Sequence, residues 1–204
     1  MDIKKIKNAN TKLLGKNIIY YDEIGSTQDE AKKLIKSGLE NGTIFLANSQ
    51  VKGRGTKERI WYSSKGNNIT MTMVLFPKCN VNKIQNLTKI IAECMAEAIS
   101  ELYGYELKIK IPNDLLLNGK KICGILTESS TINGILNHIL IGIGFNVNEE
   151  VFNEETVNIA TSLKKEYHKN FSREEIIIKF IEIFEKKIEL FNIKWNKKLL
   201  YQLK

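Results

Sequence analysis

The 204-residue sequence is short of cysteine, histidine, proline and arginine, and it contains no long apolar run. Its three cysteines, Cys79, Cys94 and Cys123, are widely spaced and include no CxxC pair, so we expect neither a disulfide framework nor a tetrahedral zinc site. No stretch approaches the ~20 apolar residues of a membrane-spanning helix, and the amino terminus lacks the apolar core of a signal peptide. These absences predict a cytoplasmic protein with reduced thiols and no membrane partner.

The overall composition is typical of one globular domain. Apolar residues make up 43% and charged residues 26% of the chain, and no internal repeat or long linker divides it. We therefore expect a single domain over residues 1–204. The 31 basic residues exceed the 23 acidic ones and give a net charge of +8, which suits an anionic partner such as a nucleotide, a nucleic acid or an acidic protein.

The order of the apolar patterns predicts an α+β fold, with a mixed, mostly antiparallel sheet flanked by helices. Strands are expected at residues 17–24, 43–47, 68–76, 107–111, 115–117, 121–128 and 135–147. Helices are expected from Ser26 or Thr27 to Gly38, over residues 82–103, and after the capping box at 172–175. The Asn-Gly pairs at 118–119 and 133–134 are typical of tight hairpin turns.

The segment 50–61 combines flexible glycines with cations. Only three arginines occur in the chain, and two of them, Arg54 and Arg59, lie within eight residues of each other together with Trp61. Lysine occupies almost every other basic position. The two arginines therefore indicate a site where a planar guanidinium, with its paired donors, binds phosphate or carboxylate. The alternative is a solvated basic loop. The segment is neither a Walker loop nor a dinucleotide fingerprint.

Two further groups of residues indicate a binding cleft. Asp114 begins a predicted hairpin whose second arm carries Lys121, which suits a magnesium ion on the carboxylate and an α-phosphate on the amine. A salt bridge at the strand end explains this pair equally well. Gly142 and Gly144 remove side chains from one face of a strand, which leaves room for a flat ring or for a closely packed helix.

Five motifs in sequence order carry a resemblance to a known family. They are Gly25-Ser26-Thr27-Gln28, Gln50-x-x-Gly53-Arg54-Gly55 with Arg59 and Trp61, Pro112-Asn113-Asp114, Lys121-x-x-Gly124-Ile125-Leu126 and Gly142-x-Gly144-x-Asn146. Together, over about residues 18–195, they resemble the catalytic domain of biotin protein ligases. The resemblance implies an enzyme that makes biotinyl-AMP from biotin and ATP. It would then transfer the biotinyl group to a lysine of a biotin carboxyl carrier protein, such as that of acetyl-CoA carboxylase.

The resemblance also implies a role for individual residues. Lys121, Arg54 and Asp114 would be catalytic, and Asp114 would also be the candidate ligand for Mg²⁺. The residues expected to bind biotin are Ser26, Thr27, Gln28, Gln50, Gly53, Arg54, Gly55, Thr56, Lys121, Gly124, Gly142 and Gly144. The residues expected to bind ATP are Arg54, Arg59, Trp61, Lys110, Asn113, Lys121 and Asn146.

Some features depart from the family pattern and keep other functions open. Thr56 stands where the family commonly has arginine, and Ile111 replaces a frequent tryptophan. We expect no amino-terminal DNA-binding domain, no carboxy-terminal β-barrel and no DNA partner, whereas a homodimer paired through sheet edges is compatible with the resemblance. The alternatives are a lipoate or octanoate transferase of related fold, whose Arg-Arg and Gly-Gly-Gly clusters do not occur here, and a non-catalytic protein that binds biotin or nucleic acid.

Overall fold

A computed structural model of the chain describes residues 1–190 and 194–195. In this part of the chain, seven strands form one sheet in the order β1-β2-β3-β8-β7-β6-β5, and β4 pairs with β9 in a second, two-stranded sheet. Only β1 and β2 pair in parallel among the described neighbours of the large sheet. The predicted α+β class, with a mixed and mostly antiparallel sheet, is confirmed.

The strands span β1 Ile18–Tyr21, β2 Ile44–Ala47, β3 Ile69–Leu75, β4 Pro77–Lys78, β5 Lys108–Lys110, β6 Asp114–Leu117, β7 Lys120–Ile132, β8 Ile135–Phe145 and β9 Lys194–Trp195. The helices span α1 Ile3–Lys7, α2 Thr27–Leu34, α3 Leu87–Tyr103, α4 Leu163–Tyr167 and α5 Arg173–Glu189. Short 3-10 turns occupy η1 Ile35–Ser37, η2 Thr56–Glu58 and η3 Val81–Ile84.

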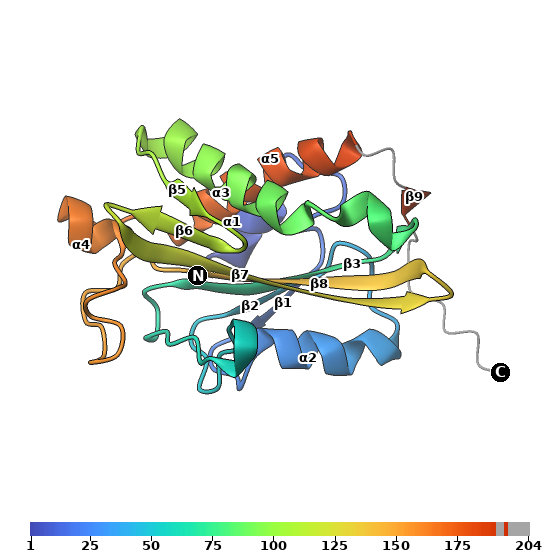
Figure 1. The fold of residues 1–204 in the computed structure, drawn as a ribbon, viewed down its shortest axis with the longest axis horizontal. Helices are drawn as coiled ribbons and strands as arrows, with labels where there is room; N and C mark the ends of the chain where they lie inside the picture. The colour runs from blue at the N-terminus through green and yellow to red at the C-terminus, as the bar shows by residue number, and fades with distance from the viewer. Residues whose placement is uncertain (191–193, 196–204) are drawn as a thin grey trace.

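The helices cover the two faces of the large sheet unequally (Figure 1). Helices α3 and α5 lie together on one face, and α2 lies on the other. The larger apolar core fills the α3 and α5 side, whereas a small second core packs under α2 around Phe45, Phe76 and Leu140. Because α2 has only 8 residues, it cannot cover the whole of its face. The part of the sheet beyond its amino terminus is available for a site.

Local signals in the sequence correctly fix most turns and helix ends. Asn118 and Gly119, and likewise Asn133 and Gly134, have positive φ angles of 50°, 79°, 51° and 76°, as tight hairpins require. The Ser26 hydroxyl caps α2 by accepting a hydrogen bond from the Asp29 N–H at 3.4 Å. Gly104 ends α3 in the left-handed conformation, with φ of 72°.

Two predicted elements need correction. The helix expected over residues 82–103 is interrupted, because Asn80 caps the separate turn η3 and Asn86 leaves the helical conformation before α3 begins. The strand expected over 17–24 ends at Tyr21, after which only Ile24 makes a single bridge to Gln50. The five-residue helices α1 and α4 escaped sequence reasoning because they are too short to display a helical period.

Cys79, Cys94 and Cys123 are free and buried, and burial raises the pKa of the Cys94 thiol to about 12. Across residues 1–190 and 194–195, the helices are too short or too polar to cross a bilayer.

Candidate active site

A pocket that is partly open to solvent lies where α2, the segment 50–61 and the middle of the sheet meet. Thirteen of its lining residues are predicted site residues: Ser26, Thr27, Gln28, Gln50, Arg54, Gly55, Thr56, Trp61, Asn113, Lys121, Gly124, Gly142 and Gly144. Met71, Thr72, Ile125, Leu126 and Ile143 complete the lining.

Three glycines on neighbouring strands form the floor of the pocket. In the strand register, Gly144 on β8 lies opposite Gly124 on β7, and Gly142 lies opposite Thr72 on β3. A Cβ atom at Gly142 would lie 2.7 Å from the Gln28 Oε1 atom, so only glycine permits the approach of that amide. The floor itself carries no side chains, and in this structure the side chains of Gln28 and Trp61 lie over it.

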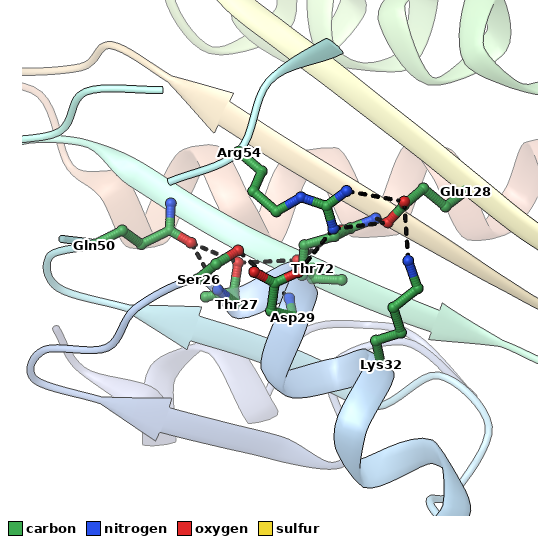
Figure 2. Close-up of polar contacts among 9 residues, drawn as sticks. Ser26, Thr27, Asp29, Lys32, Gln50, Arg54, Thr72 and Glu128 are labelled. Carbon is green, nitrogen blue, oxygen red and sulfur yellow. Dashed lines mark hydrogen bonds and ion pairs between the residues drawn. The ribbon is translucent and has the colours of Figure 1, made fainter. Parts of the chain in front are cut away.

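A polar wall is built from α2, the strand β3 and Gln50 (Figure 2). The backbone N–H of Thr27 donates to Gln50 Oε1 at 2.7 Å, which fixes the oxygen side of that amide. The hydroxyls of Thr27 and Thr72 lie 2.9 Å apart, and the Thr72 hydroxyl donates to Gln28 Oε1 at 3.1 Å. Thr27, Gln28 and Thr72 are buried, so the wall offers hydrogen-bonding groups that are already largely removed from water.

The segment that closes the pocket forms a small hairpin rather than an extended loop. Arg54 bridges to Ile60, the Trp61 N–H donates to the Gly53 carbonyl at 2.9 Å, and the Gly55 N–H donates to the Arg59 carbonyl at 2.7 Å. A Cβ atom at Gly53 would overlap the Trp61 carbonyl oxygen, so this position requires glycine for close backbone approach. The hairpin carries Trp61 back over the sheet.

The Trp61 indole lies directly above the glycine floor. A Cβ atom at Gly144 would overlap the indole, and one at Gly124 would lie 2.9 Å from its Cζ3 atom. The Lys121 Nζ atom is 5.5 Å from the centroid of the Trp61 ring, within the range of a cation–π contact. The indole Nε1 is buried and has no hydrogen-bond partner among the described residues. In this structure, Trp61 itself occupies the flat slot above Gly144.

Arg54 is held between two carboxylates at the pocket rim (Figure 2). Its guanidinium donates to Asp29 at 2.7 Å and to the two oxygens of Glu128 at 3.2 and 3.4 Å. Burial works against the charged form of Arg54, but the Glu128 and Asp29 carboxylates outweigh it and raise the pKa of the guanidinium. Burial likewise opposes ionisation of Glu128, yet hydrogen bonds from Gln28 and Lys32 and the charge of Arg54 lower its pKa. Both groups are charged at neutral pH.

Lys121 and Asp114 form an ion pair across the β6–β7 hairpin. Lys121 Nζ lies 2.8 Å from Asp114 Oδ1, and the two side chains are 31% and 21% exposed. The hairpin therefore brings the amine and carboxylate together, and it does so as the salt bridge that the sequence left as an alternative. Lys121 also lines the pocket, so its charge is within reach of a ligand there.

Five predicted site residues lie outside the pocket lining: Gly53, Arg59, Lys110, Asp114 and Asn146. Arg59 and Lys110 are exposed. Asn146 is buried and donates its side-chain N–H to the Thr161 carbonyl at 3.0 Å, so it braces a neighbouring segment. Sequence reasoning missed Thr72 and Glu128, because no local motif marks a strand residue whose partner lies on a distant helix.

The sequence matches the family model of the biotin/lipoate A/B protein ligase family over residues 20–146. This stretch contains every motif residue of the pocket, and the chain belongs to this family.

Individual relatives agree with this assignment. The chain is 37% identical over 179 residues to the bifunctional ligase/repressor BirA of Bacillus subtilis, with 87% of this chain and 55% of the relative aligned. It is 38% identical over 124 residues to the biotin–[acetyl-CoA-carboxylase] ligase of Paracoccus denitrificans, with 60% of this chain and 51% of the relative aligned. The chain thus spans about half the length of these curated relatives.

A solved structure shares the fold. The biotin protein ligase from Aquifex aeolicus in complex with biotin and ATP superposes with a TM-score of 0.73 and 28% sequence identity, covering 86% of this chain and 72% of that one.

Proposed function

We propose that this chain carries the ligase activity that attaches biotin to protein. Biotin and ATP would first give biotinyl-AMP and pyrophosphate. The amine of a lysine on a biotin carboxyl carrier protein, such as that of acetyl-CoA carboxylase, would then attack the acyl carbon and release AMP. The observation that carries the proposal is that one pocket joins a buried, uncharged hydrogen-bonding wall to the cations Arg54 and Lys121.

The polar wall fits the head of biotin. A ureido ring has one carbonyl acceptor and two N–H donors, and the amides of Gln28 and Gln50 with the hydroxyls of Ser26 and Thr27 supply both kinds of partner. The floor at Gly142 and Gly144 has no side chains of its own to obstruct a bicyclic ring. A lipoyl group has no comparable polar head, so a wall with four polar side chains favours biotin.

The two cations suit the first chemical step. The biotin carboxylate must approach the α-phosphate of ATP, and two anions repel each other unless cations lie between them. Arg54 and Lys121 line the same pocket. Arg54 contacts Asp29 and Lys121 contacts Asp114, and a more strongly anionic ligand can replace either of these two carboxylates. Attack of a carboxylate oxygen on the α-phosphorus breaks the bond to the leaving pyrophosphate, whose charge a cation stabilises.

We propose that Mg²⁺ enters the site together with ATP. The described residues contain no cluster of three His, Cys, Asp or Glu side chains able to hold a metal. Asp114 offers one carboxylate and already contacts Lys121, so the nucleotide phosphates would have to supply most of the ligands. We also propose that ATP contacts five further residues: Arg59, Trp61, Lys110, Asn113 and Asn146.

We propose in addition that the protein is cytoplasmic and that it forms a homodimer.

Release of pyrophosphate tests the proposal directly. With ATP and Mg²⁺, we expect the protein to release pyrophosphate when biotin is added and not when lipoate or octanoate is added. Transfer is then tested with radiolabelled biotin and a purified carrier domain, compared with the same domain whose target lysine is replaced by arginine. Release with lipoate or octanoate in place of biotin would favour a transferase of related fold, and no release with any of these acids would contradict an adenylating enzyme.

A further inference from the structure

Glu128 joins the polar wall to the arginine at the pocket rim. Its carboxylate accepts hydrogen bonds from Gln28 Nε2 at 2.9 Å, from the Arg54 guanidinium at 3.2 and 3.4 Å, and from Lys32 at 3.1 Å. These partners come from α2 and from the hairpin 53–61, whereas Glu128 lies on β7 (Figure 2). Its side chain is 26% exposed, compared with 53% for Lys32. Glu128 is thus the point where three separate segments meet.

The contact with Gln28 determines which way that amide faces. A carboxylate only accepts hydrogen bonds, so it selects the NH₂ side of the Gln28 amide. The oxygen, Oε1, is thereby turned toward the Thr72 hydroxyl and the floor at Gly142. Gln28 is only 2% exposed, so water does not compete effectively for either end of the amide. With Glu128 in place, the wall at Gly142 presents an acceptor rather than a donor.

The contact with Arg54 holds the hairpin 53–61 against the sheet. The hairpin is short and makes few backbone bonds to the rest of the chain, so side-chain contacts contribute strongly to its position. Arg54 reaches Glu128 with two nitrogens, which fixes the direction of the planar guanidinium as well as its distance. Glu128 therefore fixes the position of Gln28 Oε1 relative to that of the Arg54 guanidinium.

We propose that Glu128 is a positioning residue for biotin recognition: it orients the Gln28 amide so that Oε1 accepts from a ureido N–H, and it holds Arg54 at the rim. This inference rests on the proposed function, because it names the group of the substrate that the polar wall binds. The Gln28 contact lies in the polar wall, so its loss is expected to weaken biotin binding. Arg54 keeps its contact with Asp29 at 2.7 Å when residue 128 changes, so we expect little effect on ATP.

The test uses Glu128→Gln, which keeps the shape of the side chain but can donate to Gln28 and thus lets its amide turn over. We expect biotin affinity, measured by calorimetry, to fall about tenfold, as loss of the hydrogen bond between a ureido N–H and Gln28 Oε1 implies. We expect the KM for ATP to stay within about twofold. We also expect the variant to lose most of the wild-type preference for biotin over an analogue methylated on a ureido nitrogen. Glu128→Asp, which remains an acceptor only, should restore that preference.

Lys32→Met serves as the matched control, because it removes the third partner of Glu128 without touching Gln28 or Arg54. Its biotin affinity and its preference for biotin over the methylated analogue should equal those of the wild type. A loss as large as that in Glu128→Gln would contradict the proposal, because the charge cluster as a whole would then be responsible. Unchanged affinity and preference in Glu128→Gln would overturn the proposal alone. Failure of the wild-type protein to bind biotin would overturn the proposed function first. Thermal melting of each variant checks that the fold is retained.

Discussion

Lys121 has a contact on either side, with Asp114 at 2.8 Å and the Trp61 ring at 5.5 Å from its centroid. Neither contact buries the amine fully, since 31% of the side chain remains exposed. A partly exposed ion pair contributes little to stability. The same charge contributes much more where it meets charge that develops during a reaction. We therefore expect Lys121 to matter for rate far more than for folding.

Replacing Lys121 with alanine should lower the rate of biotin-dependent pyrophosphate release by about 10²–10³-fold, because one donor to developing charge is lost. Single-turnover measurements separate this step from product release. Lys120→Ala is the matched control, since Lys120 is the neighbouring cation and does not line the pocket. A rate for Lys121→Ala close to that of Lys120→Ala would show that the site assignment is wrong.

The hairpin 53–61 is the element whose conformation matters most for access to the pocket. The indole of Trp61 lies over Gly144, where we propose that the biotin ring binds. The two cannot occupy this place together, so binding must move the indole. Its buried N–H, unpaired among the described residues, makes that movement easier because no hydrogen bond is broken.

Tryptophan fluorescence can detect this movement. In a Trp195→Phe background, where Trp61 is the remaining tryptophan, we expect biotin to shift the emission to longer wavelength as the ring moves toward water. The double variant Trp61→Phe, Trp195→Phe provides the baseline. Saturating biotin binding, measured by calorimetry, without any change in Trp61 emission would contradict the assignment of the biotin ring to the Gly144 slot.

Features that depend on adjacent residues could be predicted from the sequence, whereas contacts between residues far apart in the chain could not. The hairpins at Asn118 and Asn133 and the cap at Ser26 were predictable because each depends on a few adjacent residues. The contact of Glu128 with Gln28 joins residues 100 positions apart and depends on strand register. The small hairpin 53–61 was also missed, because its turn places Lys57 in the left-handed conformation, with φ of 55°, which few lysines adopt.

Across the whole molecule, the segment before β1 is fastened to α5 by one buried carboxylate. Glu185 accepts hydrogen bonds from three consecutive backbone N–H groups, those of Lys12, Leu13 and Leu14, with distances of 2.9 and 2.7 Å for the last two. Leu14 is buried in the main core, and Glu185 itself is only 7% exposed. Without the carboxylate, three N–H groups would lose their shared acceptor in a place that water reaches poorly.

We expect Glu185→Ala to lower the free energy of unfolding by about 3 kcal/mol, because buried donors lose a charged acceptor. Urea denaturation measures this change as a lower midpoint at an unchanged slope. Glu182→Ala is the control, since Glu182 accepts a single N–H, that of Asn10, at a more exposed position. It should cost less than about 1 kcal/mol. Equal losses in the two variants would contradict a special role for Glu185.

The indole above Gly144 makes the protein an intramolecular competitor of its own ligand. A molecule that needs this place binds only the fraction of the population from which the ring has departed, and its apparent dissociation constant is the intrinsic constant divided by that fraction. If the ring held the slot in about nine molecules of ten, affinity would fall about tenfold. Substitutions at Lys57 or Ile60, which lie in the hairpin 53–61 but outside the pocket lining, should therefore tune affinity without touching the ligand if they shift this equilibrium.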